Sequence, residues 1–442
     1  MVTYGTSVIP SDQITVIGGG TVAVSAAFEN SVGLVGGMNT SEGTATPGDV
    51  TRVTSASDAA DKFGEGSELH EQIQLTRQNG AATIWALPVE ETSVSAETQS
   101  NQSGTLDNAP AFDPRVNDEH DITVTDTGGA TTTVNLVDEP PESAPSESET
   151  VDVYPPTGEY HADSAPDGDY EFSYSYGHYS TATLEPLIDR SPRIVGVLTE
   201  AESVTNDLAS ELNARATDFD FMHGVTGAQV AISDVPTYSN SVDERRITMA
   251  YPSRGYTDDA KTNEQRTVGA IAGELASLPL GLSSTNNGIG GFVHLKNTLT
   301  GPQEAGTVRD VGLMPLLDYG GTQGITVVQD MTTASEPKFE RVYAMQVVDE
   351  ATELSHLISR EYVGEQNTPS NRQNLRRSHQ NTYIGMQTTT PPMLDDFNVS
   401  VSQNDSDPNQ VDVDIGIDVV DVMDTVSVTI TVGDIVRSNG AT

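Results

Sequence analysis

Two spacings of apolar residues alternate along the chain, and they predict where its strands and helices lie. Runs rich in Val, Ile and Thr, which is the pattern of β-strands, occur at residues 13–35, 82–89, 193–198, 246–251 and 324–329. Segments with helix caps or with apolar residues three or four positions apart occur at residues 58–63, 68–79, 201–214, 265–278, 340–362 and 371–386. Because the predicted strands and helices alternate along the chain, the pattern predicts an α/β unit.

The ends of the first two helices carry specific signals. Ser57 and Ser67 each precede a helical segment, where a hydroxyl can accept a hydrogen bond from a free backbone N–H. Gly80 follows the second segment, and glycine is favoured just beyond a helix because it tolerates a positive φ. We therefore expect Ser57 and Ser67 to be N-caps and the second helix to end at Gly80.

The α/β pattern is interrupted at residues 91–185. This stretch is rich in Ser, Thr, Asp, Glu, Pro and Gly, and residues 121–137 and 170–176 alternate as strands do. It predicts an inserted, exposed, β-rich domain. The core would then be discontinuous, formed by residues 22–90 and 186–295, and would be followed by a C-terminal domain at residues 296–423.

Two alternating segments close the chain. Residues 411–419 place Val and Ile on one face and Asp on the other, and the second segment carries Val426, Val428, Ile430 and Val432 on one face. Asp424 separates the two segments. The last strand is therefore free to pair elsewhere, and the whole chain is predicted to be a mixed α+β or α/β protein.

The net charge limits the possible partners. The chain has 65 Asp and Glu against 21 Lys and Arg, a formal charge of -44, and no Cys. Such a chain binds nucleic acid and anionic membranes poorly, and it has no thiol chemistry. The charge is spread along the sequence, which is typical of a surface adapted to molar salt, so we expect a halophilic source. Residues 1–10 lack the pattern of a signal peptide, and no apolar run is long enough for a membrane anchor.

One glycine motif resembles a cofactor-binding loop. Gly18, Gly20 and Ala23 match G-x-G-x-x-A. A dinucleotide-binding loop must open a helix, whereas Thr21 and Val22 are β-branched and continue a strand. A glycine bend between strands is the preferred interpretation, and we predict no cofactor and no catalytic residue. A halophilic nucleotide-dependent enzyme that uses Gly18–Gly20 is the lower alternative.

Two features of the insertion could bind ligands. Asp167, Asp169 and Glu171 place oxygen ligands close together, which suits a hard cation such as calcium, although an acidic turn is the simpler reading. Aromatic residues at 170–179 could stack sugars, as in a surface adhesin, although packing inside a sheet is the simpler role. The absence of a signal segment argues against the adhesin.

Three arginines form a basic patch on an acidic protein. Arg372, Arg376 and Arg377 fall within one and a half turns of a predicted helix. Either nearby carboxylates compensate their charge, or they dock an acidic partner. The sequence leaves both interpretations open.

Three segments of the chain, taken in order, match the pattern of a known family. The first covers residues 22–89, and its likeness is carried by residues 25–28, 32–36, 47–54, 58–64 and 79–81. The second pairs Gly312-Leu313-Met314-Pro315 with the glycine-led strand at 324–328. The third runs from residues 362–367 into the arginine-bearing helix. In this order, the three segments resemble the contractile tail sheath proteins of tailed viruses and related injection devices. The resemblance covers a little over half of the chain.

The resemblance implies a sheath-type fold and a mechanical function. Extended arms would lend strands to neighbouring subunits, here residues 1–21 with Ile14 and Val16, and residues 424–442 with the four apolar residues named above. The C-terminal domain would face a tail tube, which makes Arg372, Arg376 and Arg377 tube-facing, and the insertion would point outward. The subunit would polymerise around the tube and contract from a metastable extended state, driving the tube through a host envelope without hydrolysis.

The resemblance also implies partners and a location. The partners would be further copies of the chain in hexameric rings stacked helically, the tail tube protein, and the baseplate and tail terminator proteins, with no direct nucleic-acid contact and no membrane insertion. The location would be the tail of a virion assembled in the host cytoplasm, with a salt-loving archaeon as the host. The sheath of a non-viral contractile device is the near alternative.

Overall fold

The computed structural model describes residues 30–422, except 117–119, 129–131, 167, 229, 231, 236–237, 239–240 and 321–323. Several predicted features therefore lie outside the described residues. They are the loop Gly18–Gly20, the candidate ligand Asp167, the N-terminal arm with Ile14 and Val16, and the C-terminal arm with Val426, Val428, Ile430 and Val432.

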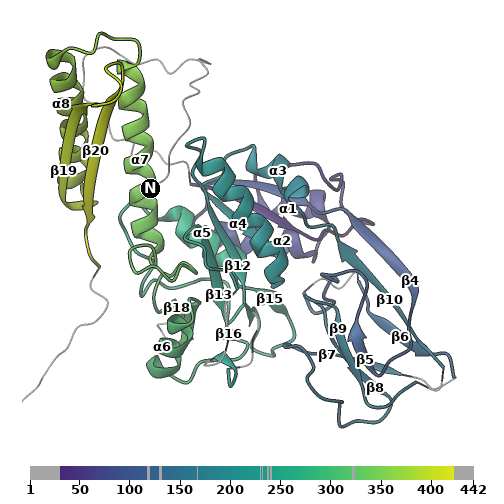
Figure 1. Ribbon diagram of the computed structural model, residues 1–442. Coiled ribbons are helices and arrows are strands. Elements are labelled where there is room, and N and C mark those ends of the chain that lie inside the picture. The colour runs from purple at the N-terminus through teal and green to yellow at the C-terminus, as the bar shows by residue number, and fades with distance from the viewer. Residues whose placement is uncertain are drawn as a thin grey trace, which may run out of the picture.

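An eight-stranded sheet forms the centre of the protein (Figure 1). Its inner strands are parallel, and antiparallel strands close both edges. The order across the sheet is β18 (Ile325–Val327), β17 (Met314–Asp318), β13 (Ile247–Tyr251), β12 (His223–Gly227), β11 (Ile194–Val197), β1 (Ser31–Gly36), β3 (Thr83–Pro88) and β2 (Thr51–Val53). The predicted mixed α/β class is confirmed.

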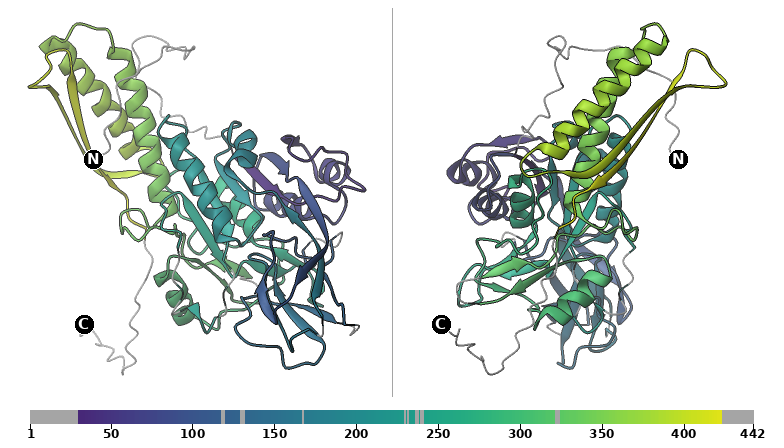
Figure 2. Two further views of the ribbon diagram at one scale, coloured as in Figure 1. Left: turned by 45° about the vertical axis from the view of Figure 1, so that its right-hand side comes forward. Right: turned by 90° about the vertical axis from the view of Figure 1, so that its left-hand side faces the viewer.

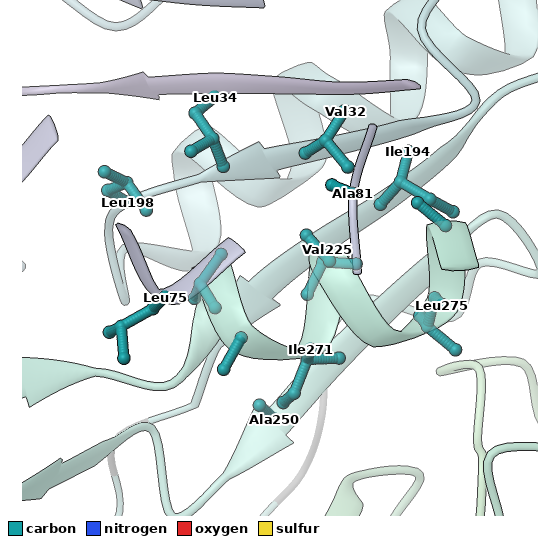
Figure 3. Packing of buried hydrophobic residues seen from close by; sticks show 14 of the residues in the cluster. Val32, Leu34, Leu75, Ala81, Ile194, Leu198, Val225, Ala250, Ile271 and Leu275 are labelled. Atoms are coloured by element: carbon teal, nitrogen blue, oxygen red, sulfur yellow. The ribbon is translucent and has the colours of Figure 1, made fainter. Parts of the chain in front are cut away.

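Helices cover both faces of this sheet. One face packs against α1 (Ala56–Phe63), α2 (Glu68–Gln78) and α5 (Val268–Ser277). The other packs against α3 (Thr181–Ile188), α4 (Glu202–Ala216) and α6 (Pro302–Asp310). Figure 3 shows the first interface, where Val32 and Leu34 of β1 face Ile271 and Leu275 of α5. Alternate residues of each buried strand thus enter two separate cores.

The helix-end predictions are partly wrong. Ser67 does cap α2, because its hydroxyl accepts a hydrogen bond from the His70 N–H, and Gly80 follows the helix with a φ of 101°. The cap of α1 is Ser55 rather than Ser57, since the Ser55 hydroxyl accepts from the Asp58 N–H at 3.0 Å. Ser55 has the extended backbone that a cap needs, whereas Ser57 already lies inside the helix.

The interruption at residues 91–185 folds into two small sheets. One contains β4 (Glu91–Gln99), β10 (Tyr170–Gly177) and β6 (Thr123–Asp126), and the other contains β5 (Ser103–Thr105), β9 (Glu159–Ala162), β8 (Thr150–Tyr154) and β7 (Thr133–Leu136). Tyr170, Phe172 and Tyr174 are buried in the core between the sheets. These rings pack inside the insertion, as the simpler interpretation expected.

The remainder comprises a three-stranded sheet and a projecting C-terminal unit. The sheet contains β15 (Glu264–Arg266), β14 (Arg254–Tyr256) and β16 (His294–Leu295). The projecting unit, here called the C-terminal module, contains α7 (Val342–Tyr362), α8 (Pro369–Thr388), β19 (Leu394–Gln403) and β20 (Val411–Val419). The module and the insertion lie at opposite ends of the central sheet (Figures 1 and 2). Strands β17 and β18 follow the predicted domain boundary at residue 296, yet they extend the central sheet.

Buried ion pairs fill the crevice between the carboxyl ends of β1 and β11. The chain order of the parallel strands reverses here, which is where open α/β sheets usually bind ligands. Arg266 Nε lies 2.6 Å from Glu68 Oε1, and its Nη1 also pairs with Glu200. Glu68 accepts from the Gly37 N–H at 2.9 Å. A Cβ at Gly36 would lie 2.5 Å from Leu198 Cδ1 and 3.0 Å from Glu68 Oε2, so glycine leaves room for both side chains.

The same network fastens the insertion to the core. Arg254 Nη1 lies 2.7 Å from Asp113 Oδ2 of the insertion, and Arg254 Nε lies 2.9 Å from Glu200 of the core. Lys296 extends the network because its Nζ lies 2.9 Å from Asp138 of the insertion and 2.9 Å from Glu264. The insertion and the core are therefore joined by charges, and those of Arg254, Asp113 and Glu200 have almost no contact with solvent.

The Asp113 carboxyl has the most strongly perturbed environment in this network. Burial alone would raise its pKa, but the guanidinium groups of Arg254 and Arg115 outweigh burial and hold the pKa well below its usual range. Asp113 therefore stays ionised in the folded protein at any pH near neutrality. Its contribution to stability is present above the unfolded pKa of about 4 and is lost only in strong acid.

Replacing Asp113 should test this attachment. Asp113→Asn removes the negative charge beside buried Arg254, so we expect a loss of about 3 kcal/mol in the free energy of unfolding. The measurement is chemical denaturation in molar salt at pH 7. Asp310→Asn is the matched control, because Asp310 pairs with Arg309 on the surface and should change stability little. Equal stability of the two variants would contradict the structural role of the network.

Candidate functional site

The C-terminal module is a two-layer unit of helices and a hairpin (Figure 2). The apolar face of the hairpin carries Phe397, Val399 and Ile417 and packs against Tyr383 and Met386 of α8. Val347, Ala351 and Leu354 of α7 complete the same core. The alternation predicted at residues 411–419 is therefore observed, with its apolar side turned towards the helices.

In the part of the chain that the structure describes, neither outer edge of the hairpin has a partner strand. β19 and β20 pair with each other from Leu394–Val419 to Gln403–Val411, and they form a sheet of only these two strands among the described residues. The outer edge of each strand presents backbone N–H and C=O groups. Such edges are templates for pairing with a further strand.

The solvent face of the hairpin is acidic. Asp396, Asp414 and Asp418 are exposed on it, and none forms an ion pair with a cation of the described residues. Asp396 and Asp418 are direct cross-strand neighbours. Like charges in this position repel, so the face gains from counter-ions or from a positively charged partner.

The helix α8 on the other side of the module is basic. It contains Arg372, Arg376 and Arg377 and no Asp or Glu. Arg376 and Arg377 are exposed, and Arg372 donates to the Asn367 carbonyl and to Asn367 Oδ1, the latter at 2.6 Å. Within residues 30–422, no described carboxylate pairs with any of the three arginines. The described part of the chain therefore shows no direct ion pair for this patch.

The N-terminal half of α7 attaches the module to the core. Arg246, which precedes β13, makes a two-pronged ion pair with Asp349 of α7, at 2.5 and 2.7 Å. Arg193 donates to the carbonyls of Ala276 and Leu278 at the C-terminal end of α5 and, at 2.7 Å, to Gln346 Oε1 of α7. These arginines link the end of α5 and the start of two core strands to one helix, so they fix the position of α7.

A buried carboxyl lies beside this joint. Glu350 of α7 is 4% exposed. Burial and the neighbouring Glu353 raise the pKa of Glu350 to about 7, against the opposing effect of Arg193. Burial also raises the pKa of Glu353, with Asp220 and Asp349 as the nearby charges. The joint therefore contains carboxyls that resist ionisation.

A large pocket, open to solvent, lies beside the ion network between the insertion and the core. Its volume is about 1040 Å³. Its described lining includes no Lys or Arg, and its carboxylates are Asp138, Glu139, Glu142, Asp152, Glu159, Glu200, Glu202 and Asp234. This acidic lining disfavours the binding of an anionic nucleotide in this cavity.

The described residues contain no group of three or more His, Asp or Glu that could hold a metal ion. Of the candidate calcium ligands, Asp169 Oδ1 accepts from the Ser100 hydroxyl at 2.6 Å, and Glu171 lies on β10. Nothing brings a third ligand to them in the described part. Among the helices that the structure describes, none has the length and apolar character needed to cross a bilayer.

Sequence reasoning missed the ion network and the α7 joint. Arg193, Arg246, Arg254 and Arg266 are all buried, although arginine usually lies on the surface. The available signal was the excess of 17 Arg over 4 Lys, because arginine is the cation preferred in buried, multiply bonded pairs. That signal points to buried pairs but does not say which arginines form them.

The raised pKa of Glu350 predicts how the stability of the protein depends on pH. Its folded pKa of about 7 lies above the unfolded value of about 4.3, so the folded protein binds more protons between these values. The free energy of unfolding should therefore fall as pH rises through this window. Glu350→Gln removes the cost of ionising a buried carboxyl. At pH 8 its free energy of unfolding should therefore exceed that of the parent by on the order of 2 kcal/mol.

The measurement is thermal unfolding of the parent and the variant at pH 4.5 and pH 8 in molar salt. The exposed Glu361→Gln on the same helix is the control and should be neutral at both values. If the difference in unfolding temperature between parent and Glu350→Gln is the same at both pH values, the assignment of a raised pKa to Glu350 is contradicted.

Comparison with known proteins finds similarity at the level of structure. No family model and no curated protein matches the sequence. The helical sheath of the anti-feeding prophage in its contracted state aligns with 96% of this chain and 99% of its own chain, with a TM-score of 0.59 and 12% identity. The sheath complex of the extracellular contractile injection system PVC, also contracted, aligns with 96% of this chain and 98% of its own, with a TM-score of 0.56 and 11% identity.

A crystal structure of a sheath tail protein from Desulfitobacterium hafniense aligns with 90% of this chain and 93% of its own, with a TM-score of 0.52 and 10% identity. All three alignments cover at least 90% of this chain and more than 90% of the other. The sequence resemblance is therefore confirmed at the level of the fold: the chain has the fold of contractile sheath proteins.

Proposed function

We propose that this chain is the subunit of a contractile sheath, which polymerises around a tail tube and shortens to drive the tube through an envelope. The observation that carries the proposal is the correspondence of the whole chain with subunits of contracted sheaths. No catalytic step is needed, and the crevice where an α/β enzyme usually binds its ligand holds buried ion pairs instead.

The subunits are held together by their terminal arms. Residues 1–21 and 424–442 each add a strand to the open edges of a β19–β20 hairpin on a neighbouring copy. Strand addition satisfies main-chain groups at the edge, with about 0.5–1.5 kcal/mol for each hydrogen bond. Several such bonds in every subunit keep the lattice connected while the subunits rotate as rigid bodies.

The module faces the tube through α8. Arg376 and Arg377 are exposed on a helix without carboxylates, which supports docking onto an acidic tube surface. The remaining partners are copies of the same chain in hexameric rings stacked helically, a baseplate and a tail terminator. The extended sheath is metastable and is held by a kinetic barrier until it contracts.

The source of this sheath is a virus of a salt-loving archaeon, with a non-viral injection device as the alternative. The formal charge of -44 supports molar salt as the working condition. Electron microscopy of whole particles separates the two sources, because a viral tail carries a DNA-filled head and an injection device does not.

The C-terminal arm should be essential for polymerisation. Val428→Asp with Ile430→Asp places charge on the predicted apolar face of residues 426–432, so we expect folded subunits that form no tubes. Negative-stain microscopy and sedimentation in molar salt provide the measurement. Ser427→Ala with Thr429→Ala changes the opposite face of the same strand and should leave tubes intact. Normal tubes from the aspartate variant would refute the role of this arm.

The arginines of α8 should determine binding to the tube. Arg376→Glu with Arg377→Glu reverses two exposed charges, and we expect sheath to bind purified tubes about tenfold more weakly, or worse, in cosedimentation. Arg309→Glu, on exposed α6, is the matched control and should bind as the parent does. Parent-like binding by the double variant would show that another surface faces the tube.

A further inference from the structure

The single tryptophan of the chain forms an exposed cluster with two arginines. Trp85 lies in β3, next to the edge strand β2, and its side chain is half-buried. Arg52 of β2 is its direct cross-strand neighbour, and the Arg52 guanidinium lies 5.9 Å from the centre of the indole. The Arg190 guanidinium lies 5.4 Å from the same centre. Both arginines are exposed.

This cluster lies where the helical cover of the sheet ends. Leu184 and Leu187 of α3 are buried in the core on the same face, with Trp85 at the margin of that core. Arg190 follows the end of α3 at Ile188. In the described part of the chain, β2 is the last strand on this side, so no strand lies beyond Arg52.

The two arginines have no carboxylate partner among the described residues. Asp189 directly precedes Arg190 in the sequence, but it pairs with Arg215 at 2.5 Å. Two adjacent cations without a described partner are unusual in a chain that carries 44 excess negative charges. The surface thus combines apolar area with positive charge.

The chemistry of this surface suits a protein contact. Tryptophan and arginine are the residue types enriched where interfaces hold most of their binding energy. Stacking on the indole orders the guanidinium groups in advance, so less conformational freedom is lost when they bind carboxylates. The expected partner is therefore a carboxylate-bearing protein surface.

We propose that Trp85, Arg52 and Arg190 form a contact between subunits and receive an acidic surface of a second copy of this chain. The inference rests on the proposed function, because a sheath brings many copies together. Charge complementarity identifies the partner, since the chain offers acidic surfaces such as the solvent face of β19–β20. The contact runs head to tail, because a basic patch of one copy meets an acidic patch of the next, and such contacts generate rings or helices.

Trp85 reports on its own contact, since no other tryptophan contributes fluorescence. The experiment compares acrylamide quenching of the full-length protein in molar salt before and after polymerisation. We expect efficient quenching in the free subunit and severalfold weaker quenching in the polymer. Unchanged quenching would overturn the proposal. Weak quenching already in the free subunit would also overturn it, because another part of the same chain would then cover Trp85.

Adding purified tail tubes tests the other possible partner of this surface, the tube protein. Protection of Trp85 that requires the tube would assign the surface to the tube protein and overturn contact with a second copy. Failure of the parent chain to polymerise at all would count against the proposed function. Polymers in which Trp85 stays accessible would refute this inference alone.

Charge reversal gives an independent test. Arg52→Glu with Arg190→Glu should raise the concentration needed for polymerisation about tenfold or more, because carboxylates would then face carboxylates. Lys261→Glu is the matched control, since Lys261 is also an exposed cation near an aromatic ring, 6.0 Å from the centre of Tyr256. Circular dichroism verifies that each variant is folded. Parent-like polymerisation of the double variant would overturn the proposal.

Discussion

The structure depends on a set of charges buried between the insertion and the core. Arg254 touches carboxylates from both parts, Asp113 on one side and Glu200 on the other. Removing such groups from water is costly, and only close, multiple contacts offset the cost. The network therefore tolerates one relative placement of the two parts. Since buried pairs are screened far less than exposed ones, this placement persists at salt concentrations that weaken surface attraction.

A rigid subunit is what a mechanical lattice requires. The ion network joins the insertion to the core. Arg246 and Arg193 join α7 to the core. Movement of one part is thus transmitted to the others. In the proposed sheath, the flexible connections lie between subunits rather than inside them, so rotation of each subunit is converted into shortening of the whole.

The sequence predicted best the elements whose periodicity matched their burial. The helices near residues 342–362 and 369–388 and the strand at 411–419 were expected because each buries one face. The strand at His223–Gly227 was missed, since it is buried on both sides and its two glycines and one threonine give no strong apolar run. The cap at Ser55 was misplaced by two residues because Ser55 and Ser57 offer the same hydroxyl at similar positions.

The candidate site was predicted only in part, and for a physical reason. Arg372, Arg376 and Arg377 stand out because they are neighbours on one helix. Arg254 and Asp113 are 141 positions apart, so only the fold brings them together. The pair Arg52 and Arg190 is equally invisible in sequence, because the two residues meet over Trp85 from separate elements.

The opposite charges on the two layers of the C-terminal module have one more consequence. Among the described residues, the helix layer carries arginines and the hairpin layer carries aspartates that have no ion-pair partner, and the two layers are back to back. A cylinder built from many such modules would have linings of different sign on its inner and outer walls. Mobile anions would gather at one wall and mobile cations at the other. The acidic tube surface proposed above would attract the arginine-bearing wall and repel the aspartate-bearing wall, so a subunit inserted backwards would bind the tube less well.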